Sequence, residues 1–432
     1  MGRDGVGYNG GMRMLDENGR FRRVLLLANP RSYRVQPFLD AAERLDIEAI
    51  PVFDLPQKLA ENWHVELGVD FNEPDTATAQ IVAWAQHHPV DAVLAVDDTG
   101  TLLAARVSQA LGLPHNDVEA ALAARDKHLM RRLLQKGGVS VPQFQLFSTT
   151  DDPQQVARQV VYPCVVKPTM LSGSRGVIRA DDEATFVSAV SRLTRLLDQI
   201  ESGPHPYLVE SFIPGFEVAL EGLLENGRLT VLALFDKPDP LDGPYFEETI
   251  YVTPSRLPQP IQNAIADCTA KACAALGLRV GPIHAELRVN EHGPWLIEVA
   301  GRSIGGLCSR TLRFGSRASL EELILRQACG LEIESTRLTG KAGGVMMIPI
   351  PQAGLLKAVH GCAEAESVPL IESVEITARL NYPLVPLPEG DAYLGFIFAR
   401  GNTPEAVEAA LRTAHSKLHF DIAPIIPLTL VT

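Results

Sequence analysis

The sequence has no long apolar segment. No part of its 432 residues forms an uninterrupted apolar stretch of about 18 residues, the length that a membrane-spanning helix needs. Residues 1–20 are rich in glycine and polar side chains, without the apolar core of a signal peptide. We therefore expect a cytoplasmic protein whose first 20 residues form a poorly ordered tail.

The sequence also lacks paired cysteines. Its 6 cysteines occur in apolar patterns without CxxC spacing and without histidine companions at metal-ligand spacing. This distribution is typical of free, buried thiols in a reducing compartment. They are Cys164, Cys268, Cys273, Cys308, Cys329 and Cys362.

Basic residues are in deficit. The chain has 39 Lys and Arg against 52 Asp and Glu, a formal net charge of −13 at pH 7. Nucleic acids and anionic membranes bind basic surfaces, so we expect neither as a partner. With 46% hydrophobic residues, the chain is long enough for two or three domains.

The first ordered region has the pattern of an α/β unit. An apolar strand is expected at 24–28, and another at 92–96 runs into a polar turn at 97–100 and a helical pattern at 102–111. Strand, turn and helix in this order are typical of a parallel sheet. We predict a small parallel-sheet domain over residues 21–116.

The middle region predicts antiparallel strands. After a helical pattern at 118–136, short strands follow, and Asn226-Gly227 between two apolar runs is a strong hairpin signal. A capping box at Ser319 and Glu322 opens a helix at 320–329. The expected domains are 21–116 (α/β), 117–335 (α+β, with lobes of about 117–205 and 206–335) and 336–432 (α+β, with one helix at 404–417).

Two glutamates face each other in one predicted hairpin. Residues 283–289 and 295–300 read as its strands, and residues 290–294 as its loop. Antiparallel pairing then places Glu286 opposite Glu298, with Cβ atoms roughly 5 Å apart. Alternation predicts a core face with Ile283, Ala285, Leu287, Val289, Trp295, Ile297 and Val299, and a polar face with His284, Glu286, Arg288 and Glu298.

Like charges placed opposite each other destabilise a sheet, so the glutamate pair needs a neutralising group. A hard divalent cation such as Mg²⁺ or Mn²⁺ takes carboxylate oxygens as ligands. The alternative is that Arg288 bridges two surface carboxylates. The hairpin alone does not decide between these two.

Lys167 ends an apolar strand, where a buried ammonium group is costly unless it faces an anion such as phosphate. Its stem could instead pack while its head reaches water. The next turn, at residues 172–176, could present backbone N–H groups to an anion, although it lacks the P-loop pattern. That turn consists of Ser172, Gly173, Ser174, Arg175 and Gly176.

A third motif is an apolar strand that leads into a bend. The backbone of this bend, at Ser211, Phe212 and Ile213, could pair with a flat heterocycle such as adenine. Glu210 and Glu217 flank it, and a carboxylate suits the two hydroxyls of a ribose. Taken individually, either glutamate fits a solvated acid at a strand end better.

The order of these parts resembles the ATP-grasp superfamily over residues from about 118 to 330. The resemblance implies that Lys127 and Lys167 contact the phosphates of ATP and that the glycine-rich turn covers them. It further implies that the bend pairs with adenine, that Glu217 holds the ribose, and that Glu286 and Glu298 bind Mg²⁺ or Mn²⁺.

A closer resemblance is to the L-amino-acid ligase branch, which makes dipeptides, and to carnosine synthase. It lies in residues 298–306 and 236–248, and in C-terminal segments such as 343–351 and 393–401. Many superfamily members carry Asn at the position of Ala300, but this branch also uses a small residue there. A homodimer is an expectation at the family level.

The resemblance implies that a carboxylate attacks the γ-phosphate of ATP and that an amine then displaces phosphate. Arg302 suits a carboxylate or a departing phosphate, and the N–H groups of Gly305 and Gly306 suit an oxyanion. His284 could receive the proton of the amine or be a hydrogen-bonded structural residue. Segments 172–177 and 239–248 are the expected lids.

The sequence thus predicts an ATP-dependent carboxylate–amine ligase that joins two L-amino acids through an acyl phosphate. Two alternatives stay open. One is an ATP-grasp ligase of nucleotide biosynthesis, and the other is a nucleotide-binding sensory protein without catalysis.

Overall fold

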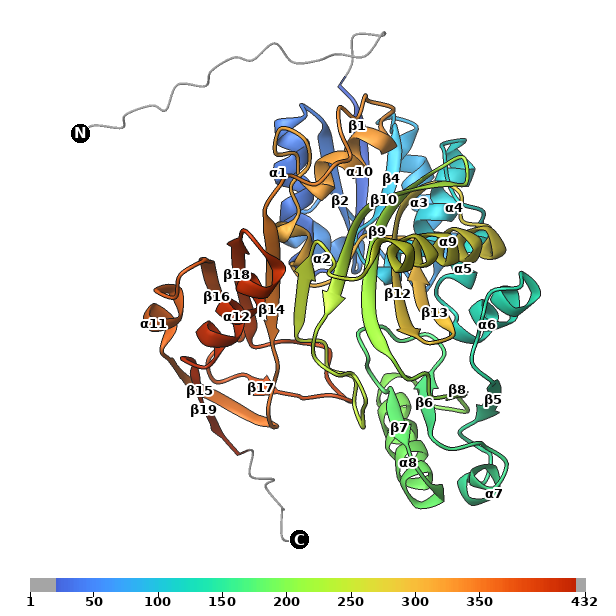
Figure 1. Ribbon diagram of the computed structural model, residues 1–432. Helices are drawn as coiled ribbons and strands as arrows, with labels where there is room; N and C mark the ends of the chain where they lie inside the picture. Colours follow the sequence, from blue (N-terminus) through green and yellow to red (C-terminus); the bar gives the residue numbers. More distant parts are fainter. Residues whose placement is uncertain (1–20, 425–432) are drawn as a thin grey trace, which may run out of the picture. The chain divides into compact units, whose positions relative to one another are not determined.

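The computed structural model describes residues 21–424, so the expected tail at 1–20 lies outside the described residues. The chain forms two compact units. Among the described residues, the first contains 21–115 together with 319–334, and the second contains 116–318 and 335–424. Figure 1 shows the elements of both units.

The first unit contains the predicted parallel sheet. Its order is β3-β2-β1-β4, and every pair of neighbours is parallel. The buried side chains of β1 form the centre of its core. The strands are β1 (Arg23–Ala28), β2 (Glu48–Asp54), β3 (Leu67–Val69) and β4 (Ala92–Ala95), and the helices are α1 (Val35–Arg44), α2 (Gln57–Asn62), α3 (Pro74–Ala85) and α4 (Thr101–Leu111).

Helix α10 (Leu320–Ala328) belongs to this first unit, not to the middle domain in which the sequence placed it. The Ser319 hydroxyl caps it by accepting from Glu322 N–H, as the capping box predicts. Glu322 also forms an ion pair with Arg44 of α1. The chain therefore returns to its N-terminal unit after residue 318.

The second unit is built on an eight-stranded sheet with the order β13-β12-β9-β10-β11-β14-β18-β16. Strand β14 pairs with β11, so the expected C-terminal domain continues the middle sheet instead of forming a separate one. The strands are β9 (Phe216–Glu225), β10 (Arg228–Lys237), β11 (Ile250–Thr253), β12 (Gly281–Asn290), β13 (Gly293–Ala300), β14 (Ala342–Ile348), β16 (Ile371–Ile376) and β18 (Gly395–Gly401). The helices against them are α9 (Gln259–Leu276) and α12 (Pro404–His415).

Two smaller antiparallel sheets complete this unit. The order of the first is β5-β8-β6-β7, and helix α8 lies along it (Figure 1). Its elements are β5 (Phe144–Ser148), α7 (Pro153–Ala157), β6 (Cys164–Pro168), β7 (Ile178–Ala180), α8 (Glu183–Ile200) and β8 (Pro206–Ser211). The second sheet comprises β15 (Gly354–His360), β17 (Pro383–Leu384) and β19 (His419–Ala423), with α11 (Cys362–Glu366) as a second C-terminal helix that the sequence did not predict.

The single helix predicted over 118–136 is two helices, α5 (Val118–Ala123) and α6 (Lys127–Lys136). The Asp126 carboxylate accepts hydrogen bonds from the N–H groups of His128 and Leu129 and so starts a new helix. Lys127 therefore lies in the first turn of α6, close to strand β6. Its N–H group donates to Thr169 O at 2.9 Å.

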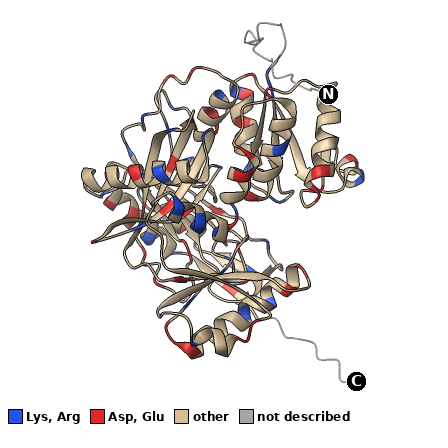
Figure 2. Cartoon of the chain, turned by 90° about the vertical axis from the view of Figure 1, so that its right-hand side faces the viewer, with Lys and Arg blue, Asp and Glu red and all other residues tan. Residues whose placement is uncertain are grey.

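The cysteines, the apolar character of the helices and the distribution of charge can be compared with the sequence. The 6 cysteines are all free. Within residues 21–424, no helix has the length and apolar character needed to cross a bilayer. Figure 2 shows Lys and Arg positions interspersed with Asp and Glu positions in the view that it gives.

Candidate active site

The structure pairs Glu286 of β12 with Glu298 of β13, as predicted, but the turn and the register of the hairpin differ from the expected ones. The turn is shorter than expected, since Asn290 already pairs with Gly293. A bulge between Glu286 and Leu287 shifts the register by one residue and restores the predicted pair.

The same bulge changes which side chains of β13 enter the core. Leu296 and Val299 are fully buried there, whereas Trp295 and Ile297 are only partly buried. The predicted core face is therefore right for β12 and wrong for Trp295 and Ile297, because strict alternation fails across a bulge.

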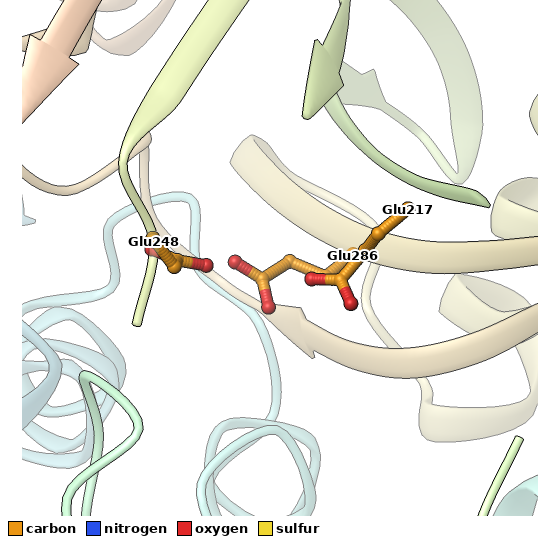
Figure 3. Close-up of side chains that lie close together, drawn as sticks. All are labelled: Glu217, Glu248 and Glu286. Carbon is orange, nitrogen blue, oxygen red and sulfur yellow. The ribbon is translucent and has the colours of Figure 1, made fainter. Parts of the chain in front are cut away.

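Glu286 lies in a cluster of three carboxylates with Glu217 and Glu248 (Figure 3). One oxygen of each lies within 4.8 Å of the others. The ammonium group of Lys237 contacts all three, at 2.8 Å from Glu217 and 3.1 Å from Glu286. Burial alone would raise the pKa of Glu286, but Lys237 and His284 together outweigh burial and lower the pKa to about 2.

Arg288 does not bridge the two facing glutamates, so that alternative is wrong. Its Nε atom donates to Glu217 at 2.9 Å, and its Nη1 atom to Ile213 O at 2.8 Å. Strand order explains this, because β9 lies between β12 and β10. Glu217 is directly opposite Arg288 on one side and Lys237 on the other.

A second, cationic cluster surrounds Glu210 at the end of β8. Its carboxylate contacts Lys167 at 2.5 Å and Arg131 of α6 at 2.6 Å. Burial lowers the pKa of Lys167 to about 8, because Glu210 is shared with Arg131 and cannot fully offset it. The Nη1 atom of Arg131 is buried and has no hydrogen-bond partner among residues 21–424. This cluster has excess positive charge and a donor available to an anion.

Lys127 lies between the hairpin and the segment before the glycine-rich turn. Its Nζ atom lies 3.4 Å from Glu298 and donates to Leu171 O at 2.6 Å. Leu171 immediately precedes the glycine-rich turn at 172–176. The predicted phosphate lysine, the predicted metal carboxylate and the turn therefore lie at one place in the fold.

His284 is held between two carboxylates, Glu221 and Glu286. Burial would lower its pKa, but Glu221 and Glu286 together outweigh burial and raise the pKa to about 9. A histidine that is protonated at neutral pH cannot accept a proton there, so the contacts match the structural alternative. Glu221 also accepts from Ile304 N–H at 3.0 Å and thereby ties the 301–306 loop to the hairpin.

Arg302, Gly305 and Gly306 belong to that loop. Arg302 is buried, and its Nη1 atom donates to Ser303 O at 2.7 Å. Gly306 has a φ of +58°, a left-handed conformation that favours glycine. The loop thus has a defined conformation directly after β13.

The adenine bend is less open than the sequence suggests. The N–H groups of Ser211 and Phe212 donate to Gln143 O and Pro163 O. The ring of Phe212 packs against Phe246 and the guanidinium group of Arg179. The carboxylate of Glu210 is taken by Lys167 and Arg131, and we infer that it positions the lysine instead of binding a nucleotide directly.

A cavity of about 510 Å³ lies beside helix α6 and strands β5, β6 and β8. It is lined by Arg132, Gln135, Gln143, Phe144, Glu210 and Ser211, among others. Lys127, Lys167, Glu286 and Glu298 do not line it. The cavity therefore reaches the cationic cluster at Glu210 but does not extend to the facing glutamates.

Four charged residues of the site were not predicted from the sequence: Arg131, Glu221, Lys237 and Glu248. Glu221 and Lys237 had a detectable signal, since each is a charged residue within or close to an apolar run of its strand. Arg131 and Glu248 had no comparable signal, because their partners come from distant segments.

Family models match three successive parts of the chain. The ATP-grasp N-terminal domain matches residues 39–115, the ATP-grasp domain residues 160–311, and the L-amino acid ligase C-terminal domain 2 residues 346–423. The chain is an ATP-grasp protein of the L-amino-acid ligase branch.

Relatives and solved structures agree with this placement. Alanine–anticapsin ligase of Bacillus subtilis (strain 168) is 28% identical over 255 residues, 55% of this chain and 53% of the relative. Dapdiamide A synthase of Enterobacter agglomerans is 28% identical over 234 residues, 52% of this chain and 54% of the relative. The ATP-grasp chain thus spans about half the length of these relatives. An L-amino acid ligase from Bacillus licheniformis has a TM-score of 0.75 at 25% identity, covering 93% of this chain and 98% of that one.

Proposed function

We propose that this ATP-grasp protein is an ATP-dependent ligase that joins a carboxylate to an amine, with two L-amino acids as substrates and ADP and phosphate as by-products. One observation carries the proposal. Arg131 of the cationic cluster donates to Ile297 O at 2.7 Å, directly before Glu298, and Lys127 lies 3.4 Å from Glu298, so groups suited to phosphate adjoin a carboxylate suited to a hard cation. Phosphoryl transfer needs both kinds of group around one anion.

The first step would use the cationic side. Lys127 and Lys167 would hold the phosphates, while Glu210 and Arg131 keep Lys167 in place. The turn at 172–176 would cover the transferred group with backbone N–H donors. These groups supply position and charge, which is most of what a phosphoryl transfer requires.

The carboxylates fit a divalent cation such as Mg²⁺ or Mn²⁺. Glu217, Glu248 and Glu286 already place three carboxylate oxygens within 4.8 Å of one another, and oxygen is the ligand that such a cation prefers. Glu286 and Glu298 would hold the cation from the two strands of the hairpin. When bound, it would neutralise charge on the transferred phosphoryl group. Ala300 offers no side-chain donor, so ligation would fall to the glutamates.

The second step would use the 301–306 loop. Arg302 would orient the acyl phosphate through its planar guanidinium group, and the N–H groups of Gly305 and Gly306 would stabilise the oxyanion formed when the amine attacks. Glu221 would keep this loop in register with the hairpin through Ile304. His284 would position Glu286 instead of transferring a proton.

The proposal predicts that ATP affinity falls as pH rises through about 8. Lys167 is charged below its pKa of about 8 and loses its charge above it. ATP would bind the charged form, so affinity should fall by up to about tenfold per pH unit above that value. Calorimetry over this range should show proton uptake on binding. A Lys167→Met variant should bind weakly without this dependence, and a constant affinity for the unaltered protein would contradict the role of Lys167.

A screen of paired L-amino acids tests the function directly. Purified protein with Mg²⁺ and ATP should release phosphate only when both a carboxylate and an amine substrate are present, and an amide should form in equal amount. Turnover with a phosphoribosyl amine alone would favour nucleotide biosynthesis. Tight Mg·ATP binding without turnover for any pair would favour a sensory protein.

A further inference from the structure

The glycine-rich turn at 172–176 is held by a distant segment, residues 386–391. Gly176 N–H donates to Pro388 O at 2.7 Å, and Arg175 Nε donates to Glu389 O at 2.9 Å. Both acceptors lie within the C-terminal part of the chain that matches the ligase-specific model. The expected lid is therefore anchored by a different region of the same unit.

The side chain of Glu389 forms a second anchor. Both of its carboxylate oxygens accept from the guanidinium group of Arg192 on α8, Oε2 at 2.7 Å from Nη2. Such two-pronged pairs fix direction as well as distance. Arg192 lowers the pKa of Glu389, so the carboxylate is charged at neutral pH.

Arg192 also holds the other expected lid. Its guanidinium group lies 5.0 Å from the ring centroid of Tyr245 and donates to the Tyr245 hydroxyl. Tyr245 belongs to segment 239–248 and pairs with Ile178 just after the glycine-rich turn. Arg179 N–H donates to Pro244 O at 2.9 Å in the same place. Helix α8, segment 239–248 and segment 386–391, which are far apart in the sequence, thus meet at Arg192.

The ion pair between Arg192 and Glu389 is weak enough to break and re-form in each catalytic cycle. Arg192 and Glu389 are each 32% exposed, so water screens their attraction. The turn itself has left-handed conformations at Gly173, Ser174 and Gly176, and its internal bond from Arg175 N–H to Ser172 O is long, at 3.4 Å. Contacts from outside the turn therefore decide its position.

We propose that Glu389 and Arg192 form a latch that holds the glycine-rich turn and segment 239–248 together over the reacting groups, so that the acyl phosphate meets the amine and not water. This inference rests on the proposed ligase function. An acyl phosphate that water reaches is hydrolysed, which consumes ATP without forming an amide. Glu389 and Arg192 are thus positioning residues for the second step.

The test is the ratio of phosphate released to amide formed, measured with both substrates present. The unaltered protein should give a ratio near one. Glu389→Gln should raise it by about two- to fivefold, the range that a partly exposed ion pair supports. Glu372→Gln is the matched control, because it breaks an exposed ion pair with Arg400 elsewhere in this part of the chain, and its ratio should stay near one.

A purely structural role would lower phosphate and amide together, so an unchanged ratio in Glu389→Gln would overturn the latch. A second readout does not depend on ligase chemistry. Hydrogen exchange at Gly176 N–H should be faster in Glu389→Gln and unchanged in Glu372→Gln. If no pair of substrates yields an amide, the ligase function fails, and exchange at Gly176 still decides whether Glu389 holds the turn.

Discussion

Replacing Lys237 with methionine is expected to lower the free energy of unfolding by about 3–5 kcal/mol. Lys237 is 3% exposed, and its ammonium group contacts the carboxylates of Glu217, Glu248 and Glu286. Methionine keeps an unbranched stem of similar length but leaves these carboxylates without their cation. Urea unfolding at neutral pH would measure the loss.

Added Mg²⁺ should restore more stability to Lys237→Met than to the unaltered protein, because a ligand that binds only the folded state stabilises it. Arg44→Met is the control. Arg44 is 53% exposed in its ion pair with Glu322, so its loss should cost no more than about 1 kcal/mol. A cost below about 1 kcal/mol for Lys237→Met, or no gain from Mg²⁺, would contradict a buried anionic cluster suited to a cation.

Glu298→Gln should reduce ligase turnover by about 10²–10³-fold while the protein stays folded. Glutamine keeps the shape of the side chain but removes the charge that would hold a divalent cation opposite Glu286. It also removes the partner of Lys127, which lies 3.4 Å away. Steady-state release of ADP at saturating ATP and Mg²⁺ would measure the effect.

The matched control is Glu291→Gln in the turn of the same hairpin, where the side chain is 80% exposed. Its turnover should equal that of the unaltered protein. If Glu298→Gln retained turnover within about twofold of that control, the assignment of Glu298 as a cation ligand would be wrong.

The site could be predicted from the sequence where it depends on short-range pairing. Glu286 and Glu298 belong to one hairpin, so alternation and a nearby turn sufficed to pair them. The bulge could not be predicted, because it exchanges Ile297 for Leu296 in the core without any proline or glycine to mark it. Two errors in the expected pairing, a shorter turn and a bulge, cancelled at the glutamates.

The charge partners could not be predicted, because they depend on strand order. Glu217 meets both Arg288 and Lys237 only because β9 lies between β12 and β10. A sequence shows that each strand carries a charged residue, but it does not show which strands are neighbours. The same limit explains why β14 was assigned to a separate domain when it continues the sheet from β11.

The boundary between α5 and α6 was also not predicted from the sequence. Asp126 divides the helical pattern at 118–136 because its side chain satisfies the first N–H groups of α6. Aspartate is common within helical patterns, so its presence there does not by itself predict a helix N-cap. The consequence for the site is large, because this cap places Lys127 beside Glu298.

Transfer of ¹⁸O from a substrate carboxylate tests the central claim most directly. With both carboxylate oxygens of the first amino acid labelled, the ligase mechanism predicts one ¹⁸O in each phosphate released and one in each amide carbonyl. This follows because the carboxylate oxygen that attacks the γ-phosphate leaves with it when the amine displaces phosphate. Release of unlabelled phosphate together with amide formation would contradict an acyl phosphate and, with it, the mechanism proposed for these residues.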